Sequence, residues 1–599
     1  LLPFVSWILA ERTSNHPQSP IELHTHSISS GVWFALVILA LTAFFVILGD
    51  HSTVNPSRSP WLVVSPTILW GMAAAVLGLF FLVRRGSLRL SVAAAIAAAF
   101  AAVSIALFVF PLGYGFDPFL HQATLDHIAL NGTITPKPFY YIGQYALELI
   151  VMLTTGASSH TIDVFLVPVL MALLLPTVTA TSVWHVTKRL LPASLAALGT
   201  LLLPLAPFIH TTPQGLAILW SLLILFLALP HLASGYRLAP PWLLMVLSVA
   251  AVLAHPLAGL PALLFSLLVV VHTQPWSKLS RAIATAILSI GGAIMLPIAF
   301  LFSGPGSQLG WHPERILHLL PPTFFGTRFD VVNDLLVILG TNLWIWMVLL
   351  AALGAGLLRR MSPRGWLLLP LLALLLSINA ILLAAAGDFS FLINYEQTNY
   401  VDRVVQLAVF ALAPLALVGF CLGLDRLLQM KKASITLGLC IIVVAAIVGN
   451  VFVAYPRHDA YAISRGFTVG ESDHDTVASI ASHANETRYI VLANQSVSAA
   501  AIQDRGFAPY YGPNGDVFYY PVPTGGSLYT IFLEMIESVA TRELAARAMD
   551  VAGVDRVYFV VNDYWWSAEQ AIERAKLSAD DWFVVNDGAT WVFVYERQN

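Results

Sequence analysis

Apolar segments of membrane-spanning length recur along this chain, and they limit what it can fold into more than any other feature. Hydrophobic residues make up 58% of the sequence and charged residues only 11%, which is outside the usual composition of soluble domains. Since a spanning helix needs about 20 apolar residues, we predict a polytopic α-helical membrane protein with about thirteen transmembrane helices. The predicted spans cover 30–49, 61–83, 88–111, 162–185, 191–209, 213–231, two short spans within 242–272 that meet at His255, 280–302, 332–357, 365–386, 403–424 and 433–455.

Basic residues cluster on alternate connections between these spans. Because Lys and Arg in short loops stay on the cytoplasmic side, the clusters predict the orientation of a multi-pass protein of the cytoplasmic membrane. The N-terminus is then cytoplasmic, and the loops 112–161, 303–331 and 387–402 lie outside together with the chain after Tyr455. The basic residues are too scattered for a nucleic-acid surface, so no nucleic-acid partner is expected.

After Tyr455 the sequence changes to the pattern of a soluble α/β domain, which we assign to 456–599. Two helical patterns, Leu528–Ala552 and Ala568–Leu577, alternate with strand-like runs. The turn signal Asn586-Asp587-Gly588 joins the last two strands as a hairpin. The predicted strands are Tyr489–Ala493, Arg556–Val561, Trp582–Val585 and Thr590–Tyr595.

The long outer loop 112–161 carries the most informative local motif, Asp117-Pro118-Phe119-Leu120-His121. An Asp followed by Pro is typical of a helix start, so a structural N-cap is one interpretation of Asp117. The other interpretation is functional, since a carboxylate where a span meets water is a candidate site residue. His121 lies one helical turn later, on the same face.

This Asp-Pro-aromatic-x-His stretch resembles that of the single-subunit archaeal and bacterial oligosaccharyltransferases, members of the GT-C superfamily of polyprenyl-phosphate-sugar-dependent glycosyltransferases. The resemblance implies a GT-C-like seven-helix module over 88–302, preceded by a lead-in and two extra helices over 1–87 and followed by an outer loop and further helices over 303–455. It also implies a cell-envelope enzyme that moves a sugar or glycan from a polyprenyl-(di)phosphate donor to a protein, lipid or glycan acceptor on the outer face of the membrane.

Two family features are missing. The loop 208–214 has no carboxylate where the family's second acidic motif belongs. The sequence therefore leaves open whether the enzyme needs a divalent cation, Mg²⁺ or Mn²⁺, as a cofactor. The Trp-Trp-Asp-Tyr-Gly signature that reads the acceptor sequon is also absent, and Asp563-Tyr564-Trp565-Trp566-Ser567 only echoes it. Sequon recognition is therefore not carried over to this chain.

The candidate catalytic residues are Asp117, as base or metal ligand, and His121, which could orient it. For the donor phosphate we select Arg403, which lies where a predicted spanning helix begins at the outer face. A guanidinium can form two parallel hydrogen bonds with phosphate oxygens. The alternative for Arg403 is an Arg that extends toward the headgroups or pairs with Asp402. Lys137 is a second phosphate candidate, or an ordinary solvated lysine.

Three further residues complete the prediction. Glu396 lies where the oligosaccharyltransferases have a Glu-bearing loop, and is a candidate acceptor-loop residue. His210 lies where the second acidic motif is missing and could join Asp117 as a metal ligand. His255, before Pro256, is expected to cap a broken helix by bonding the freed carbonyls.

Two other function classes remain open at this level. One is a non-catalytic membrane scaffold that anchors the C-terminal domain in a cell-surface assembly, for which Asp117 would be replaceable. The other is a lipid or glycolipid transporter, which would need ionisable residues at mid-membrane depth and related halves. The predicted spans are nearly free of charge, which favours the enzyme over the transporter.

Overall fold

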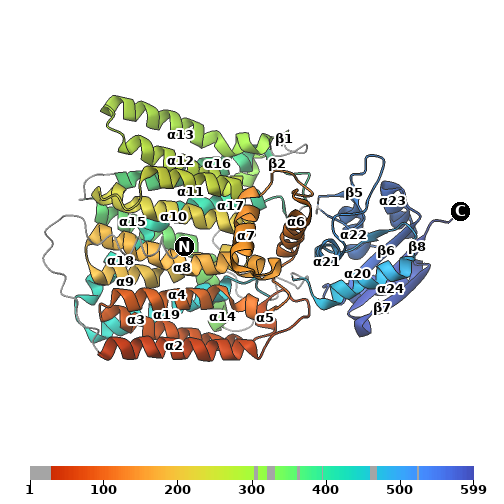
Figure 1. The fold of residues 1–599 in the computed structure, drawn as a ribbon, viewed down its shortest axis with the longest axis horizontal. Coiled ribbons are helices and arrows are strands. Elements are labelled where there is room, and N and C mark those ends of the chain that lie inside the picture. The colour runs from red at the N-terminus through yellow and green to blue at the C-terminus, as the bar shows by residue number, and fades with distance from the viewer. Residues whose placement is uncertain are drawn as a thin grey trace.

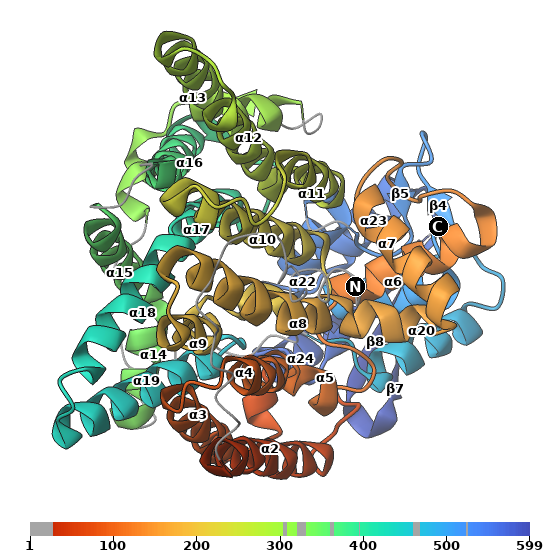
Figure 2. The same cartoon turned by 60° about the vertical axis from the view of Figure 1, so that its left-hand side comes forward.

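The computed structural model describes residues 28–302, 308–319, 331–359, 365–393, 396–458, 468–522 and 525–598. A large helical bundle carries the C-terminal α/β domain at one end, and helices α6 and α7 lie between the two (Figure 1). Seen after a 60° turn, α2, α3 and α4 lie at one edge of the bundle and α13 lies at the opposite edge (Figure 2). The predicted lead-in over 1–27 is outside the described residues.

Eight helices in the described part of the chain are long and apolar enough to cross a membrane, or nine if one bent pair is a single span. Five shorter apolar helices accompany them. All the predicted apolar runs are helical, but the expected count of thirteen spans is not confirmed. The bundle helices are α2 (Ile28–Gly49), α3 (Leu69–Arg84), α4 (Leu88–Val103), α5 (Ile105–Val109), α8 (Ser159–Thr187), α9 (Leu190–Gly199), α10 (Pro213–Ser234), α11 (Pro241–Ala254), α12 (Pro256–Thr273), α13 (Lys278–Leu301), α14 (Val331–Thr341), α15 (Leu343–Leu358), α16 (Leu368–Ala386), α17 (Asn399–Ala411), α18 (Ala413–Leu428) and α19 (Ala433–Val453).

The count is unsettled because several predicted runs are interrupted. The run 88–111 breaks at Ser104 between α4 and α5, and the run 332–357 breaks at Asn342 between α14 and α15. The run 403–424 bends by 43° between α17 and α18. Pro414, in the first turn of α18, has no N–H to continue the hydrogen bonds of α17, which explains this bend. Hydropathy alone does not detect such breaks.

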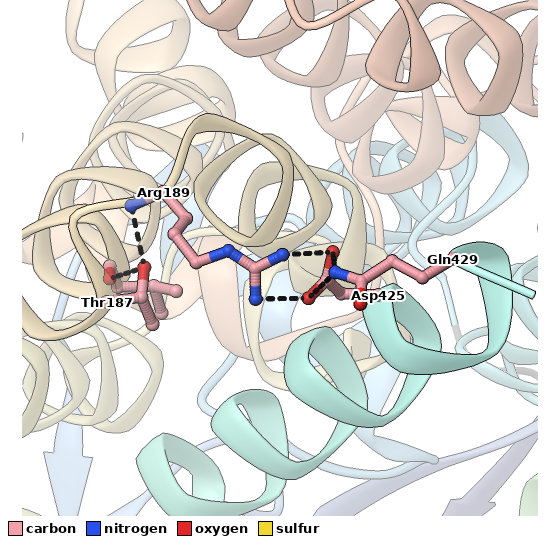
Figure 3. Close-up of polar contacts among 5 residues, drawn as sticks. Thr187, Arg189, Asp425 and Gln429 are labelled. Atoms are coloured by element: carbon pink, nitrogen blue, oxygen red, sulfur yellow. Dashed lines mark hydrogen bonds and ion pairs between the residues drawn. The ribbon is translucent and has the colours of Figure 1, made fainter.

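One ion pair fastens the end of the bundle that lies away from the C-terminal domain. The guanidinium of Arg189, just before α9, bonds both carboxylate oxygens of Asp425 in α18, with one N···O distance of 3.0 Å (Figure 3). Gln429, one turn later, donates to the same carboxylate at 3.2 Å. Asp425 is 1% exposed and Arg189 is 48% exposed, so the pair joins a buried carboxylate to a cation at the surface.

The outer loop folds as expected into two helices, α6 (Asp117–Asn131) and α7 (Ile142–Thr155). Gly113 and Gly115 enter α6 with φ of 122° and 89°, a backbone region that favours glycine. Phe119 and Ala123, on α6, are buried in the core of the C-terminal domain. The Gly115 N–H donates to the Thr468 hydroxyl at 2.8 Å, and the Val469 N–H donates to the Gly115 carbonyl at 3.2 Å. The C-terminal domain therefore holds the start of α6 in place.

The C-terminal sheet has the strand order β3-β6-β8-β7. β3 (Ile490–Leu492) runs parallel to β6 (Arg556–Asn562), and β8 (Thr590–Glu596) is antiparallel to both β6 and β7 (Asp581–Val585). All four predicted strands are confirmed, and the hairpin turn has positive φ at Asn586, Asp587 and Gly588. A separate hairpin joins β4 (Tyr510–Tyr511) and β5 (Val517–Phe518).

The helices of this domain were predicted less well. The single helix expected over 528–552 is two, α22 (Ser527–Glu537) and α23 (Arg542–Ala552), because Thr541 caps a new helix with its side chain. α24 (Ala568–Ser578) is confirmed. α20 (Glu471–Ala484) and α21 (Gln495–Arg505) were missed, since their buried faces consist mostly of Ala, Ser and Thr rather than large apolar residues.

Candidate active site

Asp117 is the first residue of α6, and its side chain does not cap the helix. The N-cap position belongs to Phe116, and no side-chain capping bond is made. Within the part of the chain that the structure describes, no hydrogen bond or ion pair to the Asp117 carboxylate is present. The N-cap interpretation of Asp117 is therefore wrong, and the carboxylate is left accessible.

The surroundings of Asp117 nevertheless act on its charge. Burial by the surrounding protein raises the pKa of the Asp117 carboxyl, Arg403 lowers it and Glu396 raises it again, with a net increase. The pKa of the exposed Asp117 side chain is thus set mainly by the low-dielectric protein around it. A raised pKa makes the ionised carboxylate a better proton acceptor near neutral pH.

Arg403, on α17, lies close enough to Asp117 to act on its charge. Its guanidinium carbon lies 5.9 Å from the centre of the Tyr400 ring, one helical turn earlier. Tyr400 is itself stacked on Phe389, with ring centres 5.7 Å apart. Arg403 is half-buried, and no ion pair with Asp402 or any other residue is found in the described ranges. The guanidinium is thus positioned by an aromatic face and keeps its N–H donors for a ligand.

Three histidines, His121, His210 and His255, lie near one another and near Arg403. His121 bonds Tyr145 through Nδ1 at 2.8 Å, so Tyr145 and not Asp117 is its hydrogen-bond partner. Burial lowers the pKa of His121 to about 4, with further contributions from His210 and His255. Burial also lowers the pKa of His210 and that of His255 to about 4, with Arg403 adding to the effect on His255. All three are neutral at pH 7 and act as hydrogen-bonding groups rather than charges.

His255 is the site residue that the sequence misassigned. Its side chain makes no capping bond at the α11–α12 break, and its Nδ1 is buried without a partner among the described residues. Instead its ring stacks on Tyr141, with centres 5.7 Å apart and an interplanar angle of 14°. The break before Pro256 places the imidazole against Tyr141. The break was visible in the sequence, but His255 was interpreted there as a cap.

The start of α7 makes this stacking possible. A Cβ on Gly143 would lie 2.7 Å from the Ala254 nitrogen, so only glycine allows α7 to approach the end of α11 this closely. Tyr141 precedes α7 with φ of 58°, an uncommon backbone conformation for a residue with a side chain. Tyr141 also lies 5.5 Å from the ring of His121. Tyr141 and Tyr145 are therefore site residues for which the sequence offered no distinct signal.

The remaining predicted residues divide into two groups. Glu396 lies just before α17 and is close enough to affect the charge of Asp117. Lys137, in contrast, is exposed between α6 and α7, with its ammonium 5.5 Å from the Tyr140 ring centre. Nothing in the described residues connects Lys137 to Asp117 or Arg403. The structure thus brings together Asp117, His121, His210, Glu396 and Arg403, and leaves Lys137 apart.

The described parts of the loops 303–331 and 387–402 are joined to each other. β1 (Gln308–Leu309) pairs antiparallel with β2 (Gly387–Asp388), and Arg315 donates to the Gly387 carbonyl at 3.0 Å. Residues 303–307, 320–330 and 394–395 of these loops lie outside the described residues. The described parts form a connected rim beside α17.

The side chains near Asp117 offer few ligands for a metal ion. Among the described residues, no group of three or more His, Cys, Asp and Glu side chains is placed to hold one. Asp117 and His210, the predicted ligands, do not make a complete site by themselves.

Comparisons with known proteins find structural neighbours. No family model matches the sequence, and no curated protein matches it. Among solved structures, the chain is similar to the arabinofuranosyltransferase AftD from Mycobacteria, solved by single-particle cryo-EM, with 14% sequence identity and a TM-score of 0.45. The match covers 85% of this chain and 40% of that one, so the chain spans less than half the length of its neighbour. The expected likeness to a glycosyltransferase is thus found, at a level that assigns no residue a role.

Proposed function

We propose that the protein is a GT-C-type membrane glycosyltransferase that transfers a sugar or glycan from a polyprenyl-(di)phosphate donor to an acceptor on the outer face of the membrane. One observation carries the proposal. Asp117 and Arg403 are far apart in the sequence, yet Arg403 lies close enough to Asp117 to act on the charge of its carboxylate. A carboxylate base beside a free guanidinium suits the attack of a nucleophile on a phosphate-linked sugar.

The reaction follows from these two groups. Asp117 accepts the proton of the acceptor's hydroxyl or amide as that group attacks the anomeric carbon. The bond between that carbon and the phosphate oxygen breaks, and its electron pair leaves with the polyprenyl (di)phosphate. Arg403 stabilises the negative charge on the leaving phosphate through its N–H donors. Attack opposite the leaving group inverts the anomeric centre.

The three histidines and Glu396 would orient the substrates. As neutral imidazoles, His121, His210 and His255 can each donate or accept one hydrogen bond with sugar hydroxyls. The Nδ1 atoms of His210 and His255 have no partner among the described residues, so they are available for this purpose. Glu396 would face the acceptor from the loop before α17.

The experiment is donor turnover by the purified full chain in nanodiscs with a panel of polyprenyl-linked sugars, followed as release of the carrier. Asp117→Asn should abolish release, since the base is removed without a change in side-chain shape. Asp126→Asn is the matched control on the same helix and should retain wild-type turnover. Full activity of Asp117→Asn would contradict the proposal, and an EDTA arm measures the dependence on Mg²⁺ or Mn²⁺.

A further inference from the structure

A second candidate site lies at the end of the bundle away from the C-terminal domain. A cavity of about 640 Å³ opens there between α12, α13 and α16. The first half of α13 forms most of its wall, and His272 at the end of α12 and Leu371 of α16 complete it. α13 begins at this end and runs along the edge of the bundle toward the β1–β2 loops (Figure 1).

The two faces of α13 differ in a way that explains the cavity. One face presents a row of exposed isoleucines, among them Ile283, Ile287 and Ile290 at 52%, 64% and 70% exposure. At 3.6 residues per turn, the face beside it carries Ala282, Thr285, Ala286 and Ser289 in the first half of the helix, where both alanines are exposed. It carries the buried residues Gly292, Leu296 and Phe300 in the second half. The inner face is therefore tightly packed near the candidate active site and hollow at the other end.

The hollow half has the chemistry of an anion site. Lys278 and Arg281 line this open cavity together with the hydroxyl-bearing residues Thr285 and Ser289. No acidic side chain lines the cavity, and neither cation has an ion-pair partner among the described residues. The N-terminus of α13 adds its own positive potential at the same place.

We propose that this cavity binds the phosphate headgroup of an anionic phospholipid in the leaflet at this end of the bundle. Lys278 and Arg281 hold the phosphate, and the acyl chains lie along the apolar outer surface of α13. Basic cavities between spanning helices are suited to such headgroups. A phospholipid fits better than a free phosphate because the exposed isoleucines provide a surface for the chains beside the cations. This site is remote from Asp117 and does not depend on the proposed transferase activity.

The test measures lipid binding by the delipidated full chain in detergent, by native mass spectrometry with dioleoyl-phosphatidylglycerol and with dioleoyl-phosphatidylcholine. Wild type is expected to prefer the anionic lipid. The double variant Lys278→Gln/Arg281→Gln should weaken phosphatidylglycerol binding by about thirty-fold, from the usual contribution of a basic residue near a lipid surface. Lys431→Gln/Lys432→Gln removes two exposed charges from another connection and is the matched control that should bind as wild type does.

A second variant tests the cavity itself. Ala286→Phe fills the space and keeps both cations, so it should lose the anionic lipid while retaining the thermal stability of wild type in phosphatidylcholine. Glycerol 3-phosphate is the probe for a free phosphate and should not compete at concentrations equal to the lipid. The proposal is overturned if both lipids bind equally, if the control pair weakens binding as much as Lys278→Gln/Arg281→Gln does, if Ala286→Phe binds normally, or if glycerol 3-phosphate displaces the lipid.

Discussion

Two arginine–aspartate combinations lie near opposite ends of the bundle, and they differ in almost every physical respect. Arg189 and Asp425 form a direct two-bond ion pair, with Gln429 as a further donor (Figure 3). Arg403 and Asp117 affect each other electrostatically but are not joined by an ion pair in the described residues. A structural pair satisfies its own charges, whereas a pair prepared for a substrate leaves its donors and acceptors available. This difference is the basis for assigning function to one and stability to the other.

The largest effect is expected for Arg403→Gln. Loss of the guanidinium removes the group that stabilises the leaving phosphate, so turnover should fall by about 10²- to 10³-fold, as for other donors that act on a developing charge. The melting temperature should stay at the wild-type value, because no ion pair is lost. Carrier release and thermal unfolding of the same preparation check both statements. A variant that unfolds early would make Arg403 a structural residue like Arg189.

Arg189→Gln should give the reverse result. It leaves the buried Asp425 carboxylate without its cation, at a cost of about 1–3 kcal/mol. This is less than the roughly 3–5 kcal/mol for breaking a fully buried pair, because Arg189 is half exposed. The melting temperature should fall, and turnover per folded molecule should be unchanged. Asp425→Asn is the matched partner variant and should cost less, since the remaining Arg189 can be hydrated. If Arg189→Gln lost turnover without losing stability, the assignment of a structural role to the Arg189–Asp425 pair would be wrong.

A smaller effect is expected at a third charge pair, His474 and Asp504 in the C-terminal domain. The distance from Nδ1 of His474 to Oδ2 of Asp504 is 2.9 Å. Burial lowers the pKa of His474, but the hydrogen bond and charge of Asp504 outweigh it, and the net pKa is raised. The stabilisation is thus fully present below the ordinary histidine pKa of about 6.5 and is lost as the pH rises through the raised value. His474→Gln should destabilise α20 by less than about 1 kcal/mol at pH 6, since the pair is partly exposed.

Hydrogen exchange in α20 at pH 6 and pH 9 measures this effect. The difference between His474→Gln and wild type should shrink at pH 9, where the wild-type histidine is no longer charged. If His474→Gln and wild type differ equally at both pH values, the His474 ring acts through packing on Phe119 rather than through charge. The centres of these two rings are 6.3 Å apart.

Prediction from the sequence worked where a pattern is local and failed where tertiary contacts decide. The apolar runs, the helices of the outer loop and the hairpin at Asn586–Gly588 follow from periodicity and turn chemistry. The breaks at Ser104 and Asn342 do not, because an apolar run looks the same whether it is straight or interrupted. In the site, Asp117 and Arg403 stood out as charges at helix ends, but His255 and Tyr141 meet only through the close approach at Gly143.

The central claim is that Asp117 is the base and that Arg403 and Glu396 set its pKa in opposite directions. The direct measurement is the pH dependence of kcat/KM for wild type, Arg403→Gln and Glu396→Gln. Activity should be lost as the pH falls through the raised pKa of Asp117. Arg403→Gln removes the charge that lowers this pKa, so its acid limb should move to higher pH. Glu396→Gln removes the charge that raises it, so its acid limb should move to lower pH. Acid limbs that stay in place, or that move in the same direction, would contradict the account.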